Sequence, residues 1–386
     1  MSRRWHDPKK LLWLLGMLAP ASALLPSQLV LHTAISAFWW SGAMLFFVAI
    51  PVMDIIGGED GANPPESDVH DMQGDRFYRW CTFMFLPVQY AGLVVACYLV
   101  AFGSLSALDK IGYAVSVGLV AGIGINAAHE LGHRVETGER RLAKIALAQS
   151  FYGHFYVEHN RGHHARVATP EDPASARLGE SLYRFFPRSI SGAVTSAWEL
   201  ERTRLARKGV GAWSIRNNVL NAWALSVVLV AALVAMFGPT VVPFLLLQGL
   251  VGILTLESVN YVEHYGLLRE RTERGRYERC APRHSWNSDR IVTNIFLYHL
   301  QRHSDHHANP GRRFQTLRTF DESPQLPAGY ATMVVLAMVP PLWRRVMDPR
   351  VLAHYDGDIT RANLRPHDRA GLERLLASVP SRADAA

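Results

Sequence analysis

The sequence predicts an all-α integral membrane protein with six transmembrane helices, arranged as three hairpins that carry a histidine-rich cap. Apolar residues make up 49% of the 386-residue chain, and they are gathered in long blocks rather than spread evenly. Each of three blocks is long enough for two membrane-spanning helices of about 20 residues. In addition, 12 of the 17 histidines fall between His129 and His307, beside the ends of these blocks.

The first apolar block, Leu11 to Met53, is too long for one span and too short for three. Pro26 begins a short polar stretch, so we expect the turn there and spans at 11–25 and 28–53. The basic N-terminus and the small residues at 21–23 resemble a cleavable secretory signal. Because the apolar stretch continues well past them, we expect a retained span instead.

The second and third blocks divide in the same way. The block from 80 to 130 is interrupted by Asp109 and Lys110, and the block from 219 to 261 is interrupted by Gly238 and Pro239. Charges or a Gly-Pro pair at these places are typical of a turn between two spans. The four expected spans are 80–103, 111–133, 219–237 and 241–262.

Basic residues predict the orientation of the chain. The segment 134–216 holds 14 Lys or Arg and the segment 269–318 holds 11, whereas the three turns hold almost none. The positive-inside rule places both segments and both termini in the cytoplasm. The net charge of +7 then reflects topology, so we expect no nucleic-acid partner. We expect a single domain, 1–386, with its cap at 134–217 and 263–330 and a membrane-surface segment and tail at 331–386.

Closely spaced histidines are the chemical signal of this sequence. His129 and His133 in AAHELGHR are four residues apart, so on a helix they share one face and can bind one metal ion. His159 and His163 repeat this spacing. His164 lies about 100° further around the helix, so these adjacent imidazoles can serve two different metal ions.

A third cluster lies in LQRHSDHH, where His303, His306 and His307 all fall near one helix face, and His264 follows the last span. Histidine clusters at a membrane boundary are costly unless they bind something. Nine imidazoles exceed the needs of one metal ion and suit two. Three further histidines can be ligands, supporting groups or structural residues: His154, His284 and His299.

Other metalloproteins share parts of this pattern. HELGH at 129–133 fits the zinc-protease motif, in which two histidines hold zinc and Glu130 acts as general base. That function would leave seven histidines without a role and needs an acidic third ligand that no later segment clearly supplies. A soluble di-iron carboxylate bundle needs a second Glu-x-x-His pair. A metal transporter would place its ligands near the bilayer midplane rather than at one face.

Four longer motifs resemble one family of membrane-bound non-haem di-iron enzymes. HELGHR, EHNRGHHARVATPEDPASAR, NYVEHYGL and SWNSDRIVTNIFLYHLQRHSDHHANPGRRFQTLR are similar to the alkane 1-monooxygenases, with xylene monooxygenase a nearer relative than the fatty-acid desaturases. The resemblance runs from about Leu11 to beyond Arg344. The alternatives within this group are a desaturase or a hydroxylase of aromatic methyl groups or fatty acyl chains.

The resemblance implies a terminal hydroxylase of medium-chain n-alkanes in the bacterial inner membrane, with six spans and a cytoplasmic di-iron site. It implies two iron ions, O₂ as co-substrate, and electrons from rubredoxin, which a reductase and NADH reduce. The alkane would enter from the membrane lipid. Its nine metal ligands fall on His129, His133, His159, His163, His164, His264, His303, His306 and His307.

Further residues are candidates for supporting roles. Glu130, Glu158, Glu263 and Asp305 each stand one residue from a predicted ligand, where a carboxylate can orient an imidazole or remain a solvated acid. Phe46 and Phe47 lie deep in the second predicted span. They are candidates to block the far end of an apolar substrate channel, or else ordinary packing residues.

A basic surface is the last candidate feature. It comprises Arg202, Arg204, Arg207, Lys208 and the arginines of 269–283. Such a surface can steer a small acidic electron carrier toward the site. The same charges are also expected if they only set the membrane topology.

Overall fold

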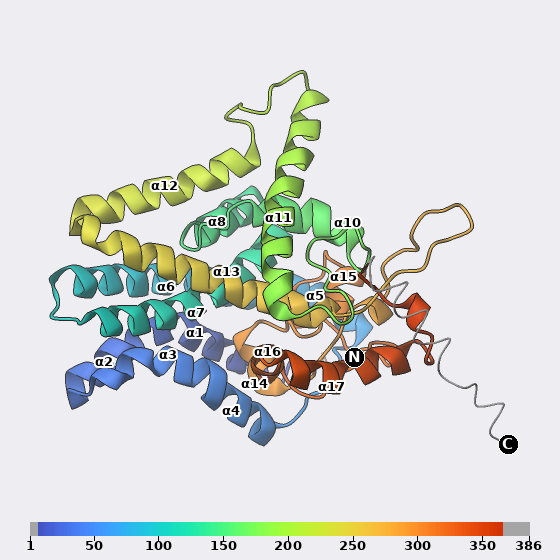
Figure 1. Cartoon of the computed structure of the whole chain (residues 1–386), viewed down its shortest axis with the longest axis horizontal. Helices are drawn as coiled ribbons and strands as arrows, with labels where there is room; N and C mark the ends of the chain where they lie inside the picture. The colour runs from blue at the N-terminus through green and yellow to red at the C-terminus, as the bar shows by residue number, and fades with distance from the viewer. Residues whose placement is uncertain (1–6, 366–386) are drawn as a thin grey trace.

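The computed structural model describes residues 7–365, which are all-helical apart from isolated β-bridges and loops. Six of the described helices are long and apolar enough to cross a membrane. They lie roughly along one direction, and the remaining helices gather at one end (Figure 1). The predicted all-helical class with six spans is confirmed, and the chain is a multi-pass membrane protein. The six membrane-competent segments are Lys10–Thr33, Ser36–Gly57, Arg76–Phe102, Ala107–Gly132, Asn218–Phe237 and Pro239–His264.

The first two spans are built from several short helices. The first contains η1 (Lys10–Met17), α1 (Leu18–Ala21), η2 (Ser22–Leu24) and α2 (Leu25–Thr33). The second contains η3 (Ser36–Trp40), α3 (Ser41–Met44), the π-helix η4 (Leu45–Ala49) and α4 (Ile50–Gly57). The other four spans are α6 (Arg76–Phe102), α7 (Ala107–Gly132), α12 (Asn218–Phe237), and η6 (Pro239–Val241) with α13 (Val242–His264).

The predicted turn at Pro26 is wrong. The chain reverses at Ala34, whose φ of 58° is left-handed, and Pro26 lies in the first turn of α2. Proline is tolerated there because the first backbone N–H groups of a helix have no partner within it. The first two spans therefore run over 10–33 and 36–57, not over 11–25 and 28–53.

Helices α7 and α13 form the centre of the bundle. Their backbones approach closely because small residues face each other: a Cβ built on Gly122 would lie 2.6 Å from the Thr255 Cβ, and one on Gly118 would lie 2.7 Å from the Gln248 carbonyl oxygen. Small residues allow such close packing between membrane helices. The ends of both helices are thereby held side by side, and both ends carry predicted ligands.

The elements outside the spans surround these two helix ends. They include α5 (Glu66–Gly74), α8 (Thr137–Ala148), α9 (Phe155–Val157), the π-helix η5 (Glu158–His163), α10 (His164–Arg166) and α11 (Leu182–Ala206). They continue with η7 (Pro282–His284), α14 (Ile291–Phe296), α15 (His303–Ala308), η8 (Phe314–Thr316) and η9 (Ile359–Arg361). Helix α11 runs across the direction of the spans (Figure 1).

The segment after residue 330 packs one side against the protein, and its place at the membrane surface stays a prediction. It forms α16 (Tyr330–Ala337) and α17 (Pro340–His354), and Met333 and Trp343 are fully buried. Helix α16 is apolar on nearly all sides, and its buried residues recur at helical spacing on a face that packs against α13. The expected polar tail from residue 366 onward, like residues 1–6, lies outside the described residues.

Candidate metal centre

The nine predicted histidines converge in two groups at the ends of α7 and α13. Within each group, the potential ligand atoms all lie within 4.8 Å of one another. The first group contains His129, His133, His159, His164 and His306. The second group contains His163, His264, His303 and His307.

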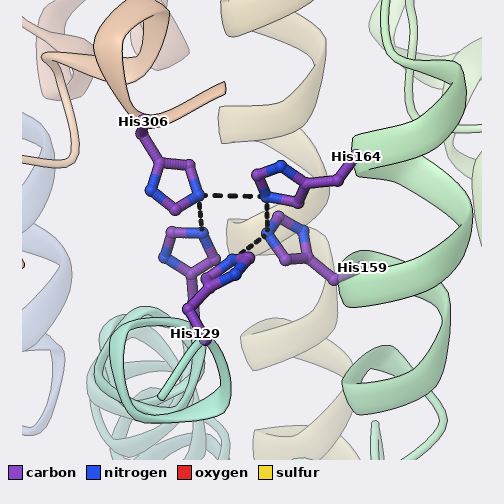
Figure 2. A group of neighbouring side chains, drawn as sticks. His129, His159, His164 and His306 are labelled. Carbon is purple, nitrogen blue, oxygen red and sulfur yellow. Dashed lines mark hydrogen bonds between the residues drawn. The ribbon is translucent and has the colours of Figure 1, made fainter. Parts of the chain in front are cut away.

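In the first group, the Nε2 atoms point toward a common centre (Figure 2). The distance between Nε2 atoms is 2.8 Å for His129 and His306, and 3.1 Å for His306 and His164. It is 3.0 Å for His164 and His159, and 3.1 Å for His159 and His133. Nitrogens bound to one metal ion at about 2.1 Å lie at comparable distances from each other.

In the second group, the Nε2 atoms converge in the same way. They are 3.2 Å apart for His163 and His307, and 2.8 Å apart for His307 and His303. The Nε2 atoms of His303 and His264 are 3.2 Å apart. All four side chains are buried, so bulk water does not separate these nitrogens.

Hydrogen bonding alone cannot satisfy these contacts. A neutral imidazole offers one N–H and one lone pair, so an Nε2 atom that faces two others cannot bond properly to both. Burial first, and the neighbouring imidazoles second, hold the pKa of His159, His306 and His307 well below its usual range. Neutral imidazole is the form that binds metals. The donor set therefore fits one metal ion in each group.

Adjacent histidines serve different groups, as their angular separation on a helix predicts. His163 belongs to the second group and His164 to the first. His159 and His163, however, do not share a metal group, although their spacing of four residues predicted that they would. Residues 158–163 form the π-helix η5, whose wider turn brings His159 beside His164 instead.

The last cluster is also divided, which corrects the expectation that its three members share one face. His303 and His307, one turn apart on α15, contribute to the second group. His306 points into the first group, where it approaches His129 and His164. Helix α15 therefore lies between the two groups and contributes to both.

Among the predicted acidic residues, Glu263 lies nearest to a group of nitrogens. Its Oε2 is 3.1 Å from the Nε2 atom of His303, and both side chains are buried. The nearby Tyr330 hydroxyl donates a hydrogen bond of 3.2 Å to the Trp286 carbonyl oxygen. Glu263 thus stands at the edge of the second group, on the side where Tyr330 lines a cavity.

The other three predicted acids hold arginines in place. The pairs are Glu130 with Arg134 at 2.7 Å, Glu158 with Arg166 at 2.8 Å, and Asp305 with Arg312 at 3.0 Å. Asp305 also accepts hydrogen bonds from the Asn309 side chain and the Arg318 backbone. These carboxylates fix the loops that enclose the histidines.

Asp172 was missed by the sequence analysis. Its Oδ2 lies 2.9 Å from Nδ1 of His163 and accepts a hydrogen bond of 2.6 Å from Ser175. Burial alone would raise the pKa of Asp172, but His163 and Ser175 lower it to about 2. A carboxylate on Nδ1 fixes the ring so that Nε2 faces the metal position. Asp172 lies nine residues from His163, so adjacency to a ligand could not identify it.

The three histidines with undecided roles lie outside both groups. His154 accepts a hydrogen bond of 3.4 Å from the Trp223 indole, and His284 pairs with Glu278 at 3.0 Å. His299 Nδ1 lies 2.9 Å from the Phe314 carbonyl oxygen. Their contacts are those of structural residues.

A narrow apolar cavity with a free volume of about 30 Å³ lies on the membrane side of the two groups. Its walls include Asn126, one turn before His129 on α7, and Val259, on α13 before His264. Phe46 lines this cavity and also a second one of about 250 Å³. Phe47 lines neither cavity and packs edge-on against Phe46 with ring centroids 5.2 Å apart.

A polar pocket of about 390 Å³ opens on the other side of the first group. His133 and His164 form part of its wall, and both are only partly buried. Its rim carries Arg134, Arg140 and Arg161. The first group is thus flanked by an apolar cavity on one side and a cationic opening on the other.

Comparisons with known proteins agree with this architecture. Residues 110–337 match the fatty acid desaturase family. The chain is 44% identical to an alkane 1-monooxygenase of Acinetobacter baylyi over 96% of its length and 91% of that protein. It is 46% identical to one of Ectopseudomonas oleovorans, covering 93% and 89%.

A more distant relative has a different name. The chain is 28% identical to the xylene/toluene monooxygenase hydroxylase component of Pseudomonas putida, over 64% of this chain and 66% of that protein. The relatives above that match over nearly their full length are alkane 1-monooxygenases. By its sequence over almost its entire length, and with nine histidines that converge at the ends of its spans, the chain belongs to the alkane 1-monooxygenase family.

Proposed function

We propose that this protein is an oxidoreductase that hydroxylates the terminal carbon of medium-chain n-alkanes. The reaction consumes O₂, two electrons and two protons, and yields a primary alcohol and water. The observation that carries this proposal is that two groups of histidine nitrogens lie at the ends of α7 and α13, whose preceding turns line a buried apolar cavity. The names of the relatives, alkane 1-monooxygenases, support the same reaction.

The nine histidines are proposed as ligands of two iron ions, five imidazoles for one and four for the other. Imidazole is a suitable ligand for iron. The two irons would bind and reduce O₂, which no side chain can do. The surrounding residues keep the imidazoles neutral, orient His163 through Asp172, and exclude water from the second group.

The zinc-protease function is disfavoured by the same contacts. His129 and His133 share their group with three further histidines, which leaves little space for a peptide substrate. Glu130, the general base of that motif, is bound to Arg134 and accepts a hydrogen bond from the Phe314 backbone. A carboxylate held in this way is not free to activate water.

The apolar cavity is proposed to hold the alkane, which enters from the membrane lipid. Its walls are almost entirely apolar, as a site for a hydrocarbon chain requires. Phe46, between the two cavities, is proposed to limit the length of chain that fits. Phe47 is proposed to support the position of the Phe46 ring.

Electrons are proposed to come from rubredoxin, reduced by its reductase and NADH, at the polar pocket beside His133 and His164. Arg134 and Arg161 in its wall are paired with Glu130 and Glu201. Arg140 is exposed and forms no ion pair with a carboxylate of residues 7–365, so it would attract an acidic carrier. The basic surface from the sequence analysis is a weaker candidate. Arg202 and Arg204 are already paired with glutamates at 2.7 and 2.6 Å.

Arg140→Glu is expected to slow reduction by rubredoxin at low salt without loss of iron.

The membrane arrangement is proposed to be that of a bacterial inner-membrane protein. The six spans pair as three hairpins, and the histidine-bearing ends and both termini face the cytoplasm. The excess of basic residues at 134–216 and 269–318 supports this orientation.

The decisive experiment measures iron and zinc in the purified protein and in His164→Ala. The natural chain is expected to hold about two irons. His164→Ala is expected to hold less iron and to hydroxylate less octane in the presence of rubredoxin, its reductase and NADH. His154→Ala is the matched control, because His154 is buried outside both groups. One zinc per chain, unaffected by His164→Ala, would overturn the proposal, and product analysis separates alcohols from desaturated products.

A further inference from the structure

The connection between α11 and α12 projects from the edge of the molecule. It comprises residues 207–217, and Figure 1 shows it beyond the bundle, at the far end of α11. Gly209, with a φ of +66°, lies in the turn that follows α11. The membrane-competent helix α12 begins directly after this connection, at Asn218. The connection must therefore lie at the surface of the membrane.

Two large apolar side chains of this connection face outward. Trp213 is 81% exposed and Ile215 is 88% exposed, which makes them the two most exposed among the tryptophan, leucine, isoleucine and valine side chains of the described residues. The Trp213 ring packs on Trp198 of α11 with ring centroids 5.0 Å apart, so it is held in this position. Tryptophan is enriched at the boundary between lipid and water. These side chains suit insertion among lipid headgroups.

Three exposed cations accompany these apolar residues. They are Arg207, Lys208 and Arg216, and within residues 7–365 no carboxylate forms an ion pair with any of them. The neighbouring arginines differ: Arg202 and Arg204 are bound to Glu199 and Glu201. Cations beside a membrane attract anionic lipids by about 1 kcal/mol each, which is roughly a fivefold preference per cation.

The backbone of the connection is fixed. Arg204 donates a hydrogen bond of 2.7 Å to the Arg216 carbonyl oxygen. The Asn217 side chain accepts a hydrogen bond from Val219 N at 2.8 Å and donates one to the Ala212 carbonyl oxygen at 2.8 Å. These bonds restrain the connection, so its cations and its two apolar side chains stay within one short segment of the chain.

A groove suited to an acyl chain begins close to this surface. It lies between α12 and α13, has a volume of about 560 Å³, and is lined by apolar residues apart from Ser226. Trp223 and Phe151 belong to its wall, and Trp223 is five residues into the span. Within a bilayer, such a groove is filled by hydrocarbon. From Trp223 the groove runs along α12 to Val234, away from the connection, as is required of an acyl chain whose headgroup lies at the connection.

We propose that the α11–α12 connection and the α12–α13 groove form a binding site for an anionic phospholipid. The phosphate and headgroup bind Arg207, Lys208 and Arg216, and one acyl chain lies in the groove. Trp213 and Ile215 insert beside the headgroup. The site attaches the outer end of α11 to the membrane and binds a lipid rather than an acidic protein.

The test uses the full-length, iron-loaded protein and Arg207→Gln/Lys208→Gln/Arg216→Gln. Lipid retained after purification is identified by mass spectrometry, and thermal unfolding is compared with added phosphatidylglycerol or phosphatidylcholine. The natural chain is expected to retain phosphatidylglycerol and to be stabilised more by it. In the triple variant, the preference for phosphatidylglycerol over phosphatidylcholine is expected to fall at least tenfold. Its iron content is expected to be unchanged, since the three residues are exposed.

Arg274→Gln/Arg276→Gln/Arg279→Gln is the matched control, because it removes the same charge from an exposed loop elsewhere. Trp213→Ser/Ile215→Ser is expected to weaken retention of both lipids. Equal phosphatidylglycerol preference in the triple variant and the control would overturn the proposal. Equal stabilisation by inorganic phosphate would also do so, as would a raised KM for rubredoxin with unchanged lipid retention. Because the readout is lipid binding, these outcomes are independent of the hydroxylase proposal.

Discussion

Helices α7 and α12 are both membrane-competent spans, but protein surrounds them to very different extents. Of the most apolar 18 residues of α7, 89% are buried inside the protein, against 22% of those of α12. Helix α7 carries glycines where it packs closely against α13, and His129 lies in its last turn. Helix α12 is rich in Val and Leu and contributes no histidine to the metal groups. Apolar length therefore identifies a span, but small residues and a polar end indicate which span holds the site.

The largest expected effect comes from enlarging a small residue of α7. Gly122→Val places its Cβ 2.6 Å from the Thr255 Cβ and 3.1 Å from the Gly252 carbonyl oxygen. We expect the free energy of unfolding to fall by about 3 kcal/mol, because backbone in a packed interface cannot move aside. Thermal unfolding in detergent and iron content measure this. Gly138→Val is the control, since a Cβ there meets nothing within 4 Å; equal losses would show that α7 and α13 are not tightly packed.

Helix α12 is fixed mainly at its beginning, and a pH experiment tests this. The buried Glu201 carboxylate accepts a hydrogen bond from Asn218 N at 2.7 Å and pairs with Arg204 at 2.6 Å. Burial alone would raise the pKa of Glu201, but these partners lower it to about 2. The ionised carboxylate therefore stabilises the fold fully above its unfolded pKa near 4.5, and this stabilisation is lost as the pH falls toward 2.

Glu201→Gln is expected to cost about 3 kcal/mol at neutral pH and to remove this acid dependence. Unfolding midpoints measured from neutral pH down to the acid limit of the natural chain give both quantities. Glu199→Gln is the control, because Glu199 is exposed and pairs only at the surface with Arg202. A Glu201→Gln protein with the full acid dependence of the natural chain would exclude Glu201 as its source.

Asp172→Asn tests whether the loop that follows α10 contributes to metal binding, in addition to the histidines on the helices. The change keeps the volume but removes the charge that faces Nδ1 of His163. Metal affinity is expected to fall about 10- to 100-fold, as for other carboxylates that orient a ligating histidine. Competition with a chelator measures this, and Asp358→Asn, at an exposed helix cap, is the control. Unchanged affinity would mean that packing alone orients His163.

These residues also show what the sequence could and could not predict. Six spans followed from the apolar blocks, because a bilayer demands long apolar helices. The turn at Ala34 did not, because proline is compatible with both a turn and the first turn of a helix. The convergence of the histidines agreed with their spacing, but the pairing of His159 with His164 depends on a π-helix that spacing does not reveal. Asp172 reaches His163 only through the fold of the loop.

A smaller effect is expected at the cavity beside α7. Phe46→Ala removes the ring that lines both apolar cavities, so longer alkanes should fit. The ratio of kcat/KM for a longer to a shorter alkane is expected to rise about tenfold, a typical value for a few contacts in an apolar pocket. Phe47→Ala is the matched control, because Phe47 lines neither cavity. Equal shifts in both variants would assign the effect to general loosening of the second span.

The smallest expected effect is on α12, and it completes the comparison with α7. Val228 is 65% exposed on α12, while Val117 on α7 is fully buried. Val228→Leu should change the free energy of unfolding by less than about 0.5 kcal/mol, because a lipid-facing methylene exchanges one hydrocarbon neighbour for another. Val117→Leu should cost about 1–3 kcal/mol, since the packed interface has no space for it. If both substitutions cost the same in detergent, the outer face of α12 must be covered by protein, and a second copy of the chain would be the first candidate.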